Sequence, residues 1–315
     1  MFFCALLLKK ITVPFYYHLK AGSNYTIGTL ETDNPLFIIK DSIKIIDRNS
    51  LNLHPAPEYM ADPFIVKEND YYYIFYEELS SKLNAPKGAD ISVLKSKDLK
   101  KWENLGRVLD EPFHLSYPNV FKYINKWYML PEAGASNELR LYESNNFPFD
   151  WKLKKILMKD LKIYDTTLII KDGVFYLMGV NEDKLRLFYS DNLFDNWKEH
   201  PKSPIREGYK NDVRPAGRPG IISDSLYYFI QDNTYGYGTG VIAYRIDSIS
   251  PSDFKDKRIE NNPILFRFGK GWASNGIHQL SWVKTNKNSY FCVVDGNQSH
   301  KMEWGFSWRN LPEFR

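Results

Sequence analysis

The hydrophobic and polar positions of this chain repeat one pattern five times. A polar residue comes first, an apolar strand follows, and a polar turn leads into a second strand rich in aromatic residues. The first copy runs from Ala61-Asp62-Pro63-Phe64-Ile65 through the Glu68-Asn69-Asp70 turn to Tyr71–Tyr76. Apolar runs on both sides of a polar turn predict a β-hairpin. The copies recur at spacings of 55, 48, 53 and 59 residues, measured between Pro63, Pro118, Thr166, Pro219 and His278.

Each of the first four hairpins is followed by a third strand, a polar turn and an aromatic residue. In the first copy these are Ile91–Leu94 and Trp102. Four strands and about fifty residues per unit are typical of a propeller blade. We therefore predict an all-β fold, a five-bladed β-propeller with four-stranded blades. Residues 1–315 are expected to form one domain, with blades that start near residues 60, 115, 163, 216 and 275.

The segment 1–53 precedes the first predicted blade, and the fifth unit has few strand residues after Val294. Since an open ring would expose unpaired backbone groups, we expect a strand from this segment to complete the last blade. The alternative is a cap across one face. The apolar run 2–8 is too short to span a membrane and lacks the flanks of a secretory signal. We expect no membrane span and a cytoplasmic location.

Composition narrows the possible functions. The net charge is +4 with both signs scattered along the chain, which gives no reason to expect nucleic acid as a partner. The two cysteines, Cys4 and Cys292, form no disulfide framework. His and carboxylate residues show no spacing that demands a metal, and no cofactor is expected. Aromatic residues make up 16% of the chain, which suits strands and contacts with carbohydrate.

Polar residues at the starts of the five repeats are the first candidates for chemistry. In a propeller the first strand of each blade lines the central axis, so these starts converge on one concave funnel. Any single member, such as Asp62 before a proline, could instead cap a turn. The converging residues are Asp62, Tyr117, Asn119, Asp165, Arg218 and His278.

The repeat pattern resembles a known group of enzymes over roughly residues 55 to 300. The motifs Ala61-Asp62-Pro63-Phe64-Ile65, Asp165-Thr166-Thr167-Leu168 and Gly276-Ile277-His278 are similar to those of five-bladed propellers of the arabinanase, levansucrase and invertase type. Within that group, Leu130-Pro131-Glu132-Ala133 and Arg214-Pro215-Ala216-Gly217 resemble the N-terminal region of plant glucosamine inositolphosphorylceramide transferases. Bacterial relatives of that region occur among surface-polysaccharide genes.

The resemblance implies roles for individual residues. Asp62 matches the general base or nucleophile of the hydrolases, Asp165 matches the carboxylate that tunes the acid and binds sugar hydroxyls, and His278 matches a residue of the sugar site. The arabinanase-type hydrolases carry an acidic glutamate where this chain has Arg218, and arginine donates no proton at neutral pH. Glu132 is a substitute acid or, equally, a structural hydrogen-bond partner. We expect it at the far end of a strand adjacent to the funnel residues.

An arginine in place of an acid favours a leaving group that is already a phosphate. Arg214 and Arg218 would hold that phosphate, Trp272 would add a sugar contact, and Asp62 would deprotonate an acceptor hydroxyl. We therefore expect an inverting glycosyltransferase that acts on a glycan with a nucleotide-sugar donor, beside a partner enzyme of polysaccharide or glycolipid assembly. A glycoside hydrolase and a non-catalytic carbohydrate-binding propeller are the alternatives.

Overall fold

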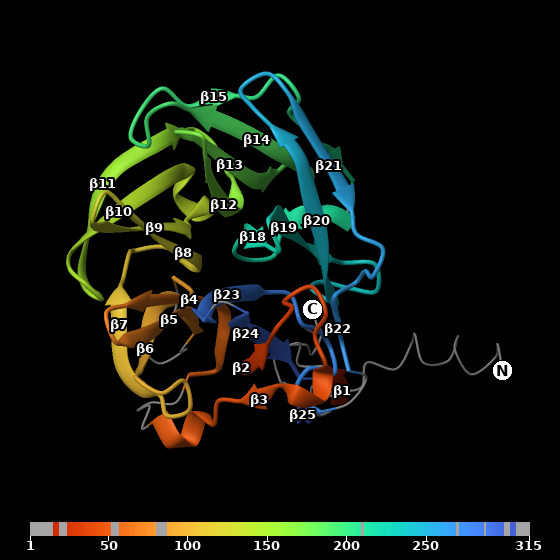
Figure 1. Ribbon diagram of the computed structural model, residues 1–315. Helices are drawn as coiled ribbons and strands as arrows, with labels where there is room; N and C mark the ends of the chain where they lie inside the picture. Colours follow the sequence, from red (N-terminus) through yellow and green to blue (C-terminus); the bar gives the residue numbers. More distant parts are fainter. Residues whose placement is uncertain are drawn as a thin grey trace, which may run out of the picture.

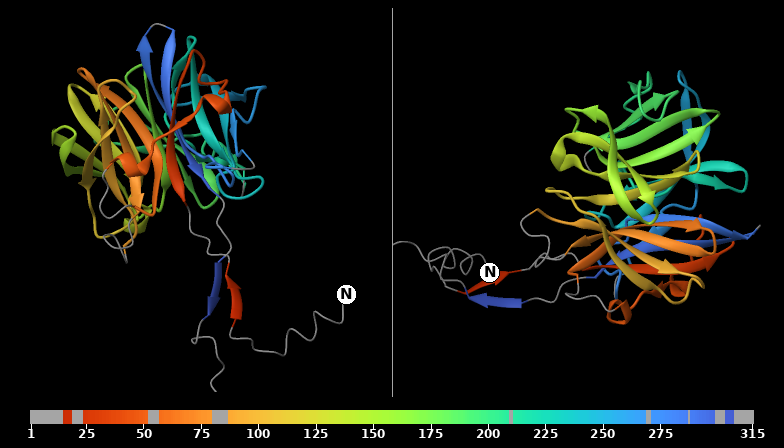
Figure 2. Two further views of the ribbon diagram at one scale, coloured as in Figure 1. Left: turned by 90° about the horizontal axis from the view of Figure 1, so that it is seen from below. Right: turned by 90° about the vertical axis from the view of Figure 1, so that its left-hand side faces the viewer.

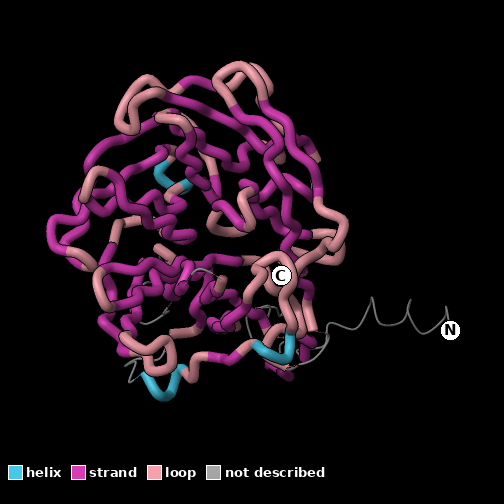
Figure 3. Tube along the Cα trace, viewed as in Figure 1, coloured by secondary structure: helices cyan, strands magenta, loops and turns pink. Residues whose placement is uncertain are grey.

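The protein forms a ring of five antiparallel sheets around a central axis (Figure 1). The computed structural model describes residues 15–18, 24–51, 57–79, 87–208, 211–268, 271–286, 288–298 and 303–306. Among these residues, strands predominate and the only helices are three short 3₁₀ turns, at Lys40–Ser42, Arg48–Leu51 and Gly134–Ser136 (Figure 3). The predicted all-β, five-bladed propeller is confirmed.

The first three blades follow the chain in order. The first contains β4 (Tyr59–Glu68), β5 (Tyr71–Leu79), β6 (Asp90–Ser96) and β7 (Glu103–Leu109). The second contains β8 (Ser116–Tyr123), β9 (Lys126–Glu132), β10 (Glu138–Asn146) and β11 (Phe149–Lys159). The third contains β12 (Tyr164–Lys171), β13 (Val174–Asn181), β14 (Lys184–Ser190), β15 (Lys198–Glu199) and β16 (Arg206–Glu207).

The last two blades are less regular. The fourth contains β17 (Asn211–Pro215), β18 (Gly220–Ile222), β19 (Ser225–Asp232), β20 (Gly240–Ile249), β21 (Phe254–Arg258) and β22 (Leu265–Phe266). The fifth contains β23 (Leu280–Asn286), β24 (Ser289–Asn297), β2 (Tyr25–Thr32) and β3 (Lys44–Ile45). A separate two-stranded sheet pairs β1 (Phe15–His18) with β25 (Glu303–Phe306), beside the ring in Figure 2.

The N-terminal strand β2 closes the ring. It pairs antiparallel with β24 along its whole length, from Tyr25 opposite Asn297 to Thr32 opposite Tyr290. The last blade is therefore built from both ends of the sequence, and β2 takes the place of its third strand. This closure satisfies the backbone groups of β24 that would otherwise form an open edge.

Apolar side chains fill the space between every pair of neighbouring blades. The described residues form five buried clusters, one at each junction between blades. The cluster between the fifth and first blades joins Ile27 of β2 and Val293 of β24 to Met60 and Ile65 of β4. Because each blade is apolar on both faces, no blade can bury its surface until the ring is complete.

The starts of the first three inner strands share an unusual backbone conformation. Asp62, Tyr117 and Asp165 have φ angles of 50°, 44° and 51°, in the left-handed region that non-glycine residues seldom adopt. Each lies where the strand pairing slips by a β-bulge. A bulge re-aims a side chain, and such bulges are common beside active sites. The repeat therefore turns equivalent side chains toward the axis.

Ring closure can be tested on the strand β2. Ile27 is fully buried, so Ile27→Ala should lower the free energy of unfolding by about 2–5 kcal/mol, as measured by urea denaturation. Glu31 lies on the same strand with an exposed side chain, and Glu31→Ala should change the stability by less than about 0.5 kcal/mol. Equal, small effects of the two substitutions would show that β2 does not hold the ring together.

Candidate active site

A cavity of about 280 Å³ opens where the inner strands begin. Its walls come from the first, second, third, fourth and fifth blades. They are rich in carboxylic acids and aromatic rings, and they carry one arginine and two histidines. The lining residues are Tyr25, Tyr59, Ala61, Asp62, Glu77, His114, Ser116, Glu132, Tyr164, Arg214, Tyr237 and His278.

Asp62 lines the cavity, and a backbone N–H holds one of its two carboxylate oxygens. The N–H of Tyr117 donates to Asp62 Oδ2 (3.2 Å), and Oδ1 lies 3.8 Å from His278 Nε2. Burial raises the pKa of Asp62 to about 7, with contributions from Asp165 and Asp295, while His278 and Arg214 oppose the rise. An acid with a pKa near 7 can take or give a proton at neutral pH.

His278 is fixed by Asp295 and by two tyrosines. Its Nδ1 lies 2.7 Å from Asp295 Oδ2, and the ring of Tyr25 stacks on it at 4.7 Å between ring centroids. Tyr237 contacts it edge to face at 5.4 Å. Burial alone would lower the pKa of His278, but Asp295 and Asp62 raise it to about 8. The imidazolium form therefore faces Asp62 at neutral pH.

Glu132 lies at the cavity end of the second blade, just as Asp62 lies at the cavity end of the first blade. The Ser116 hydroxyl donates to Glu132 Oε2 (3.0 Å), and the N–H of Gly134 donates to Oε1 (2.6 Å). Burial and the nearby Asp165 raise the pKa of Glu132 to about 7. The expected position at the far end of a strand is wrong, because β9 runs antiparallel to β8 and ends beside the start of β8.

Glu77 occupies the place in the first blade that Glu132 occupies in the second. Ala61 pairs with Glu77, as Ser116 pairs with Glu132. The Tyr59 hydroxyl donates to Glu77 Oε1 (2.7 Å), and burial raises the pKa of this carboxyl well above its usual range. Glu77 is not among the residues expected from the sequence, although Phe75-Tyr76-Glu77 and Leu130-Pro131-Glu132 stand at corresponding places in the second strands of their repeats.

His114 faces Glu77 from the edge of the cavity. The N–H of Ala89 donates to His114 Nδ1 (3.1 Å), so the neutral ring carries its proton on Nε2, which lies 3.4 Å from Glu77 Oε1. Burial lowers the pKa of His114. This neutral tautomer directs its Nε2–H toward Glu77 and adds no positive charge to the site.

Asp165 adjoins the cavity through Arg214. The guanidinium of Arg214 forms a fork on this carboxylate, with Nε 2.5 Å from Oδ2 and Nη2 3.2 Å from Oδ1. The amide of Gln231 also donates to Oδ2 (3.3 Å). A bidentate pair of this kind is strong and well oriented. Arg214 thus adds a second cation to the site beside the His278 imidazolium, and Asp165 holds it in place.

Arg218 does not line the cavity, so its expected place at the funnel is wrong. Its Nη2 donates to the carbonyl of Val120 (2.7 Å), and its Nε lies 3.4 Å from Ser281 Oγ. The six residues from Pro215 to Gly220 face only four on β19, Tyr227 to Ile230, and this shift places Arg214 at the mouth instead. Arg218 braces the second, fourth and fifth blades.

Three other expected site residues lie outside the cavity lining. Tyr117 is fully buried and its hydroxyl accepts the N–H of Gly217 (2.8 Å) across the axis. Asn119 is also buried, and its amide donates to the carbonyl of Thr166 (3.2 Å). Trp272 packs against Phe268 and lies over Gly28 and Gly296 of the last blade. Tyr117 and Asn119 therefore support the site, and Trp272 belongs to the blade core.

Among the described residues, Asp62, His278 and Asp295 form the group that could hold a metal ion, with ligand atoms within 4.8 Å of one another. Both oxygens of Asp295 already accept backbone N–H groups. Those of His278 and Gln279 lie 3.0 and 3.1 Å from Oδ1, and that of Asp62 lies 3.1 Å from Oδ2. These contacts describe a hydrogen-bond network around His278, and the donor set does not call for a metal.

Comparison with known proteins assigns the family. Residues 44–297 match the family described as "Glucosamine inositolphosphorylceramide transferase 1, N-terminal". The chain belongs to this family. It is 33% identical over 251 residues to glucosamine inositolphosphorylceramide transferase 1 of Oryza sativa subsp. japonica, which covers 76% of the chain and 33% of the relative. The Arabidopsis thaliana relative of the same name is 31% identical over 302 residues, and this match covers 87% of the chain and 39% of the relative.

The chain therefore spans about a third of the length of these curated relatives. Solved structures of similar fold include an α-L-arabinofuranosidase of Podospora anserina, with a TM-score of 0.58 and 13% identity over 87% of this chain and 98% of that one. An α-L-arabinanase of Cellvibrio cellulosa has a TM-score of 0.56 and 16% identity, over 78% of this chain and 90% of the arabinanase chain. The family thus has the propeller fold of glycoside hydrolases. No helix in the described part of the chain has the length and apolar character to cross a membrane.

The raised pKa of Glu132 predicts how stability varies with pH. A carboxyl that ionises near pH 7 when folded and near 4.5 when unfolded stabilises the fold below pH 4.5, and this contribution is lost as the pH rises to 7. Glu132→Gln still accepts the N–H of Gly134, donates its amide N–H to Ser116 Oγ in place of the present bond, and removes the titration. Between pH 4.5 and 7 its free energy of unfolding should fall less than that of the wild type, by on the order of 1–3 kcal/mol.

Urea denaturation at several pH values measures this difference. Glu103→Gln, in an exposed residue of β7, is the matched control and should follow the wild-type curve. If Glu132→Gln also runs parallel to the wild type, Glu132 is not a carboxyl with a raised pKa.

Proposed function

We propose that this chain is a carbohydrate-active enzyme that transfers a sugar, with Asp62 as the general base. The observation that carries the proposal is the setting of the Asp62 carboxylate. One oxygen accepts a backbone N–H, the other lies 3.8 Å from His278 Nε2, and the residue lines the inner cavity. A positioned base with a pKa near 7 suits the deprotonation of a sugar hydroxyl.

The proposed reaction is an inverting displacement. Asp62 takes the proton of an acceptor hydroxyl while the acceptor oxygen forms a bond to the anomeric carbon. The bond from that carbon to the leaving-group oxygen breaks, and the leaving group departs with the electron pair. A phosphate or diphosphate leaving group needs no proton, only positive charge. The Arg214 guanidinium, which its fork on Asp165 orients beside the cavity, supports a phosphate-bearing donor such as a nucleotide sugar.

The biological setting is part of the same proposal. The curated relatives are named glucosamine inositolphosphorylceramide transferase 1, and this name supports a role in the assembly of glycolipid or surface polysaccharide. We place this activity in the cytoplasm. The relatives are about three times as long as the matched region, which supports a partner enzyme or domain that acts together with the propeller.

Hydrolysis is the second candidate, and Glu132 favours it. Glycoside hydrolysis uses two carboxylic groups, one ionised and one protonated. Asp62 and Glu132 both have pKa values near 7 in one cavity. Hydrolysis by this pair should show a bell-shaped dependence on pH centred near 7. Transfer from a phosphate donor needs only the ionised base, and its rate should rise with pH through 7.

The test is incubation with a panel of nucleotide sugars and aryl glycosides, with and without glycan or inositolphosphorylceramide acceptors. Transferred sugar and free sugar are both measured. We expect transfer that depends on an acceptor, and Asp62→Asn should reduce it by roughly 10²–10⁴-fold because the base is lost. Asparagine fits this position, since it tolerates a positive φ and still accepts the N–H of Tyr117.

Asp172→Asn is the matched control. Asp172 has nearly the same φ, 52°, but lies in an exposed turn, so its substitution should leave the activity unchanged. Release of free sugar without acceptor would favour the hydrolase. Binding of sugar with no turnover of any donor would favour a non-catalytic carbohydrate-binding propeller. Full activity in folded Asp62→Asn protein would reject Asp62 as the base.

A further inference from the structure

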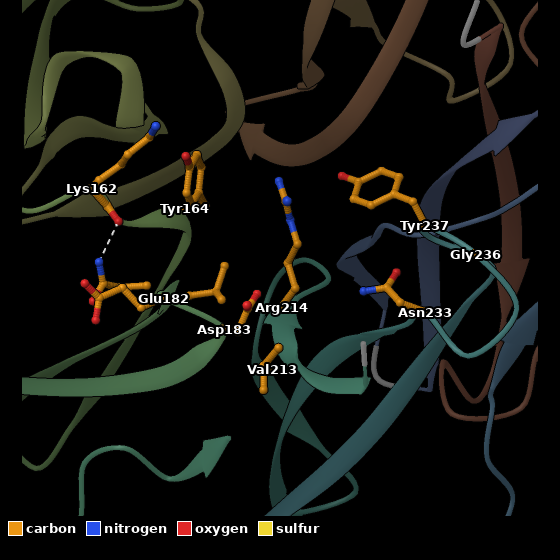
Figure 4. A pocket seen from close by; sticks show the side chains of 11 residues that line it. Lys162, Tyr164, Glu182, Asp183, Val213, Arg214, Asn233, Gly236 and Tyr237 are labelled. Carbon is orange, nitrogen blue, oxygen red and sulfur yellow. Dashed lines mark hydrogen bonds between the residues drawn. The ribbon is translucent and has the colours of Figure 1, made fainter. Parts of the chain in front are cut away.

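A second, larger cavity lies beside the funnel. Its volume is about 640 Å³, and it shares Tyr164, Arg214 and Tyr237 with the inner cavity. Figure 4 shows Arg214 rising between the two tyrosine rings. The guanidinium carbon lies 5.7 Å from the ring centre of Tyr164 and 5.2 Å from that of Tyr237. A molecule bound in this outer cavity can therefore reach the inner one past Arg214.

Arg214 has one nitrogen to spare. Nε and Nη2 are both used on Asp165, and no described residue accepts a hydrogen bond from Nη1. The side chain of Arg214 keeps 28% of its surface exposed, in contrast to 2% for its partner Asp165. The fork is thus held rigid by the buried carboxylate, while the remaining N–H groups stay available to a ligand.

Lys162 brings a second positive charge to the outer cavity. Its Nζ lies 5.7 Å from the ring centre of Tyr164, and no carboxylate of the described residues pairs with it. The Asn181 amide donates to the Lys162 carbonyl (2.9 Å) and fixes this part of the wall, as the dashed line in Figure 4 shows. Two cations therefore lie close to the ring of Tyr164: Lys162, which comes just before β12, and Arg214 of β17.

Two acids also line the outer cavity, but they lie apart from these cations. In the view of Figure 4, Glu182 and Asp183 are on one side of the cavity, and the Lys162 amine and the Arg214 guanidinium are on the other. Glu182 also lies 3.9 Å from Arg186, outside the cavity lining. The wall that carries the Lys162 amine and the Arg214 guanidinium is therefore the one away from these two acids.

We propose that the outer cavity binds an anionic group, a phosphate or carboxylate, that is attached to the sugar held in the funnel. Arg214 Nη1 contacts the group nearest the sugar, and Lys162 neutralises its remaining charge. Guanidinium and ammonium groups bind phosphate and carboxylate through charge-assisted hydrogen bonds. This site rests on the proposed function and gives its donor a position. The sugar lies against Asp62 in the inner cavity, and the charged group lies in the outer cavity at the wall formed by Arg214, Tyr164 and Lys162.

Calorimetry with a panel of hexose 1-phosphates and the matching methyl hexosides tests this site. For the sugar that fits the funnel, the wild type should bind the phosphate form about tenfold or more tightly. Lys162→Met keeps the apolar stem of an exposed residue and should reduce that preference to about threefold or less. Lys159→Met is the matched control, an exposed lysine outside both cavities, and should keep the preference.

The outcomes separate the two proposals. If a methyl hexoside binds as tightly as its phosphate form, or if Lys162→Met keeps the full preference, the anionic site is wrong while the sugar site stands. If no hexose binds in either form, the proposed function fails and the anionic site fails with it. Inorganic phosphate alone should compete with the hexose phosphate in the wild type, and lack of competition at any concentration would also contradict the site.

Discussion

The buried Asp295 carboxylate is the contact on which the site depends. It has no exposed surface, and it accepts the backbone N–H groups of Asp62, His278 and Gln279. Those groups belong to the first and fifth blades, which meet where the ring closes. A buried charge is tolerated only when it is fully hydrogen-bonded, so Asp295 requires these two blades to adopt one fixed arrangement. That arrangement holds the left-handed turn at Asp62 and the ring of His278 together.

The remaining carboxyls extend this arrangement around the axis. Tyr117 donates to Asp62 from the second blade, and Arg214 of the fourth blade binds Asp165 of the third. Asp62 and Asp165 are thus each held by a group from the next blade, so their arrangement exists only in the closed ring. Burial of several acids in one cavity raises the pKa values of Asp62 and Glu132 toward neutrality, which is the range that proton transfer in water requires.

Local patterns in the sequence were sufficient to predict the five blades, because each hairpin repeats its own turn and apolar run. Asp62 and His278 could be placed for the same reason, since they stand at repeat starts. Arg218 was misplaced because extra residues after Pro215 shift the fourth repeat, which spacing alone does not reveal. Tyr25 was missed because its contact with His278 arises from ring closure, which brings β2 into the last blade.

A crystal structure of Asp62→Asn protein soaked with its tightest-binding hexose 1-phosphate tests the central claim most directly. We expect a sugar ring in the inner cavity with a hydroxyl about 3 Å from residue 62, and a phosphate that contacts Arg214 on the side of Lys162. A sugar bound elsewhere on the propeller, with the inner cavity filled by water alone, would contradict the account.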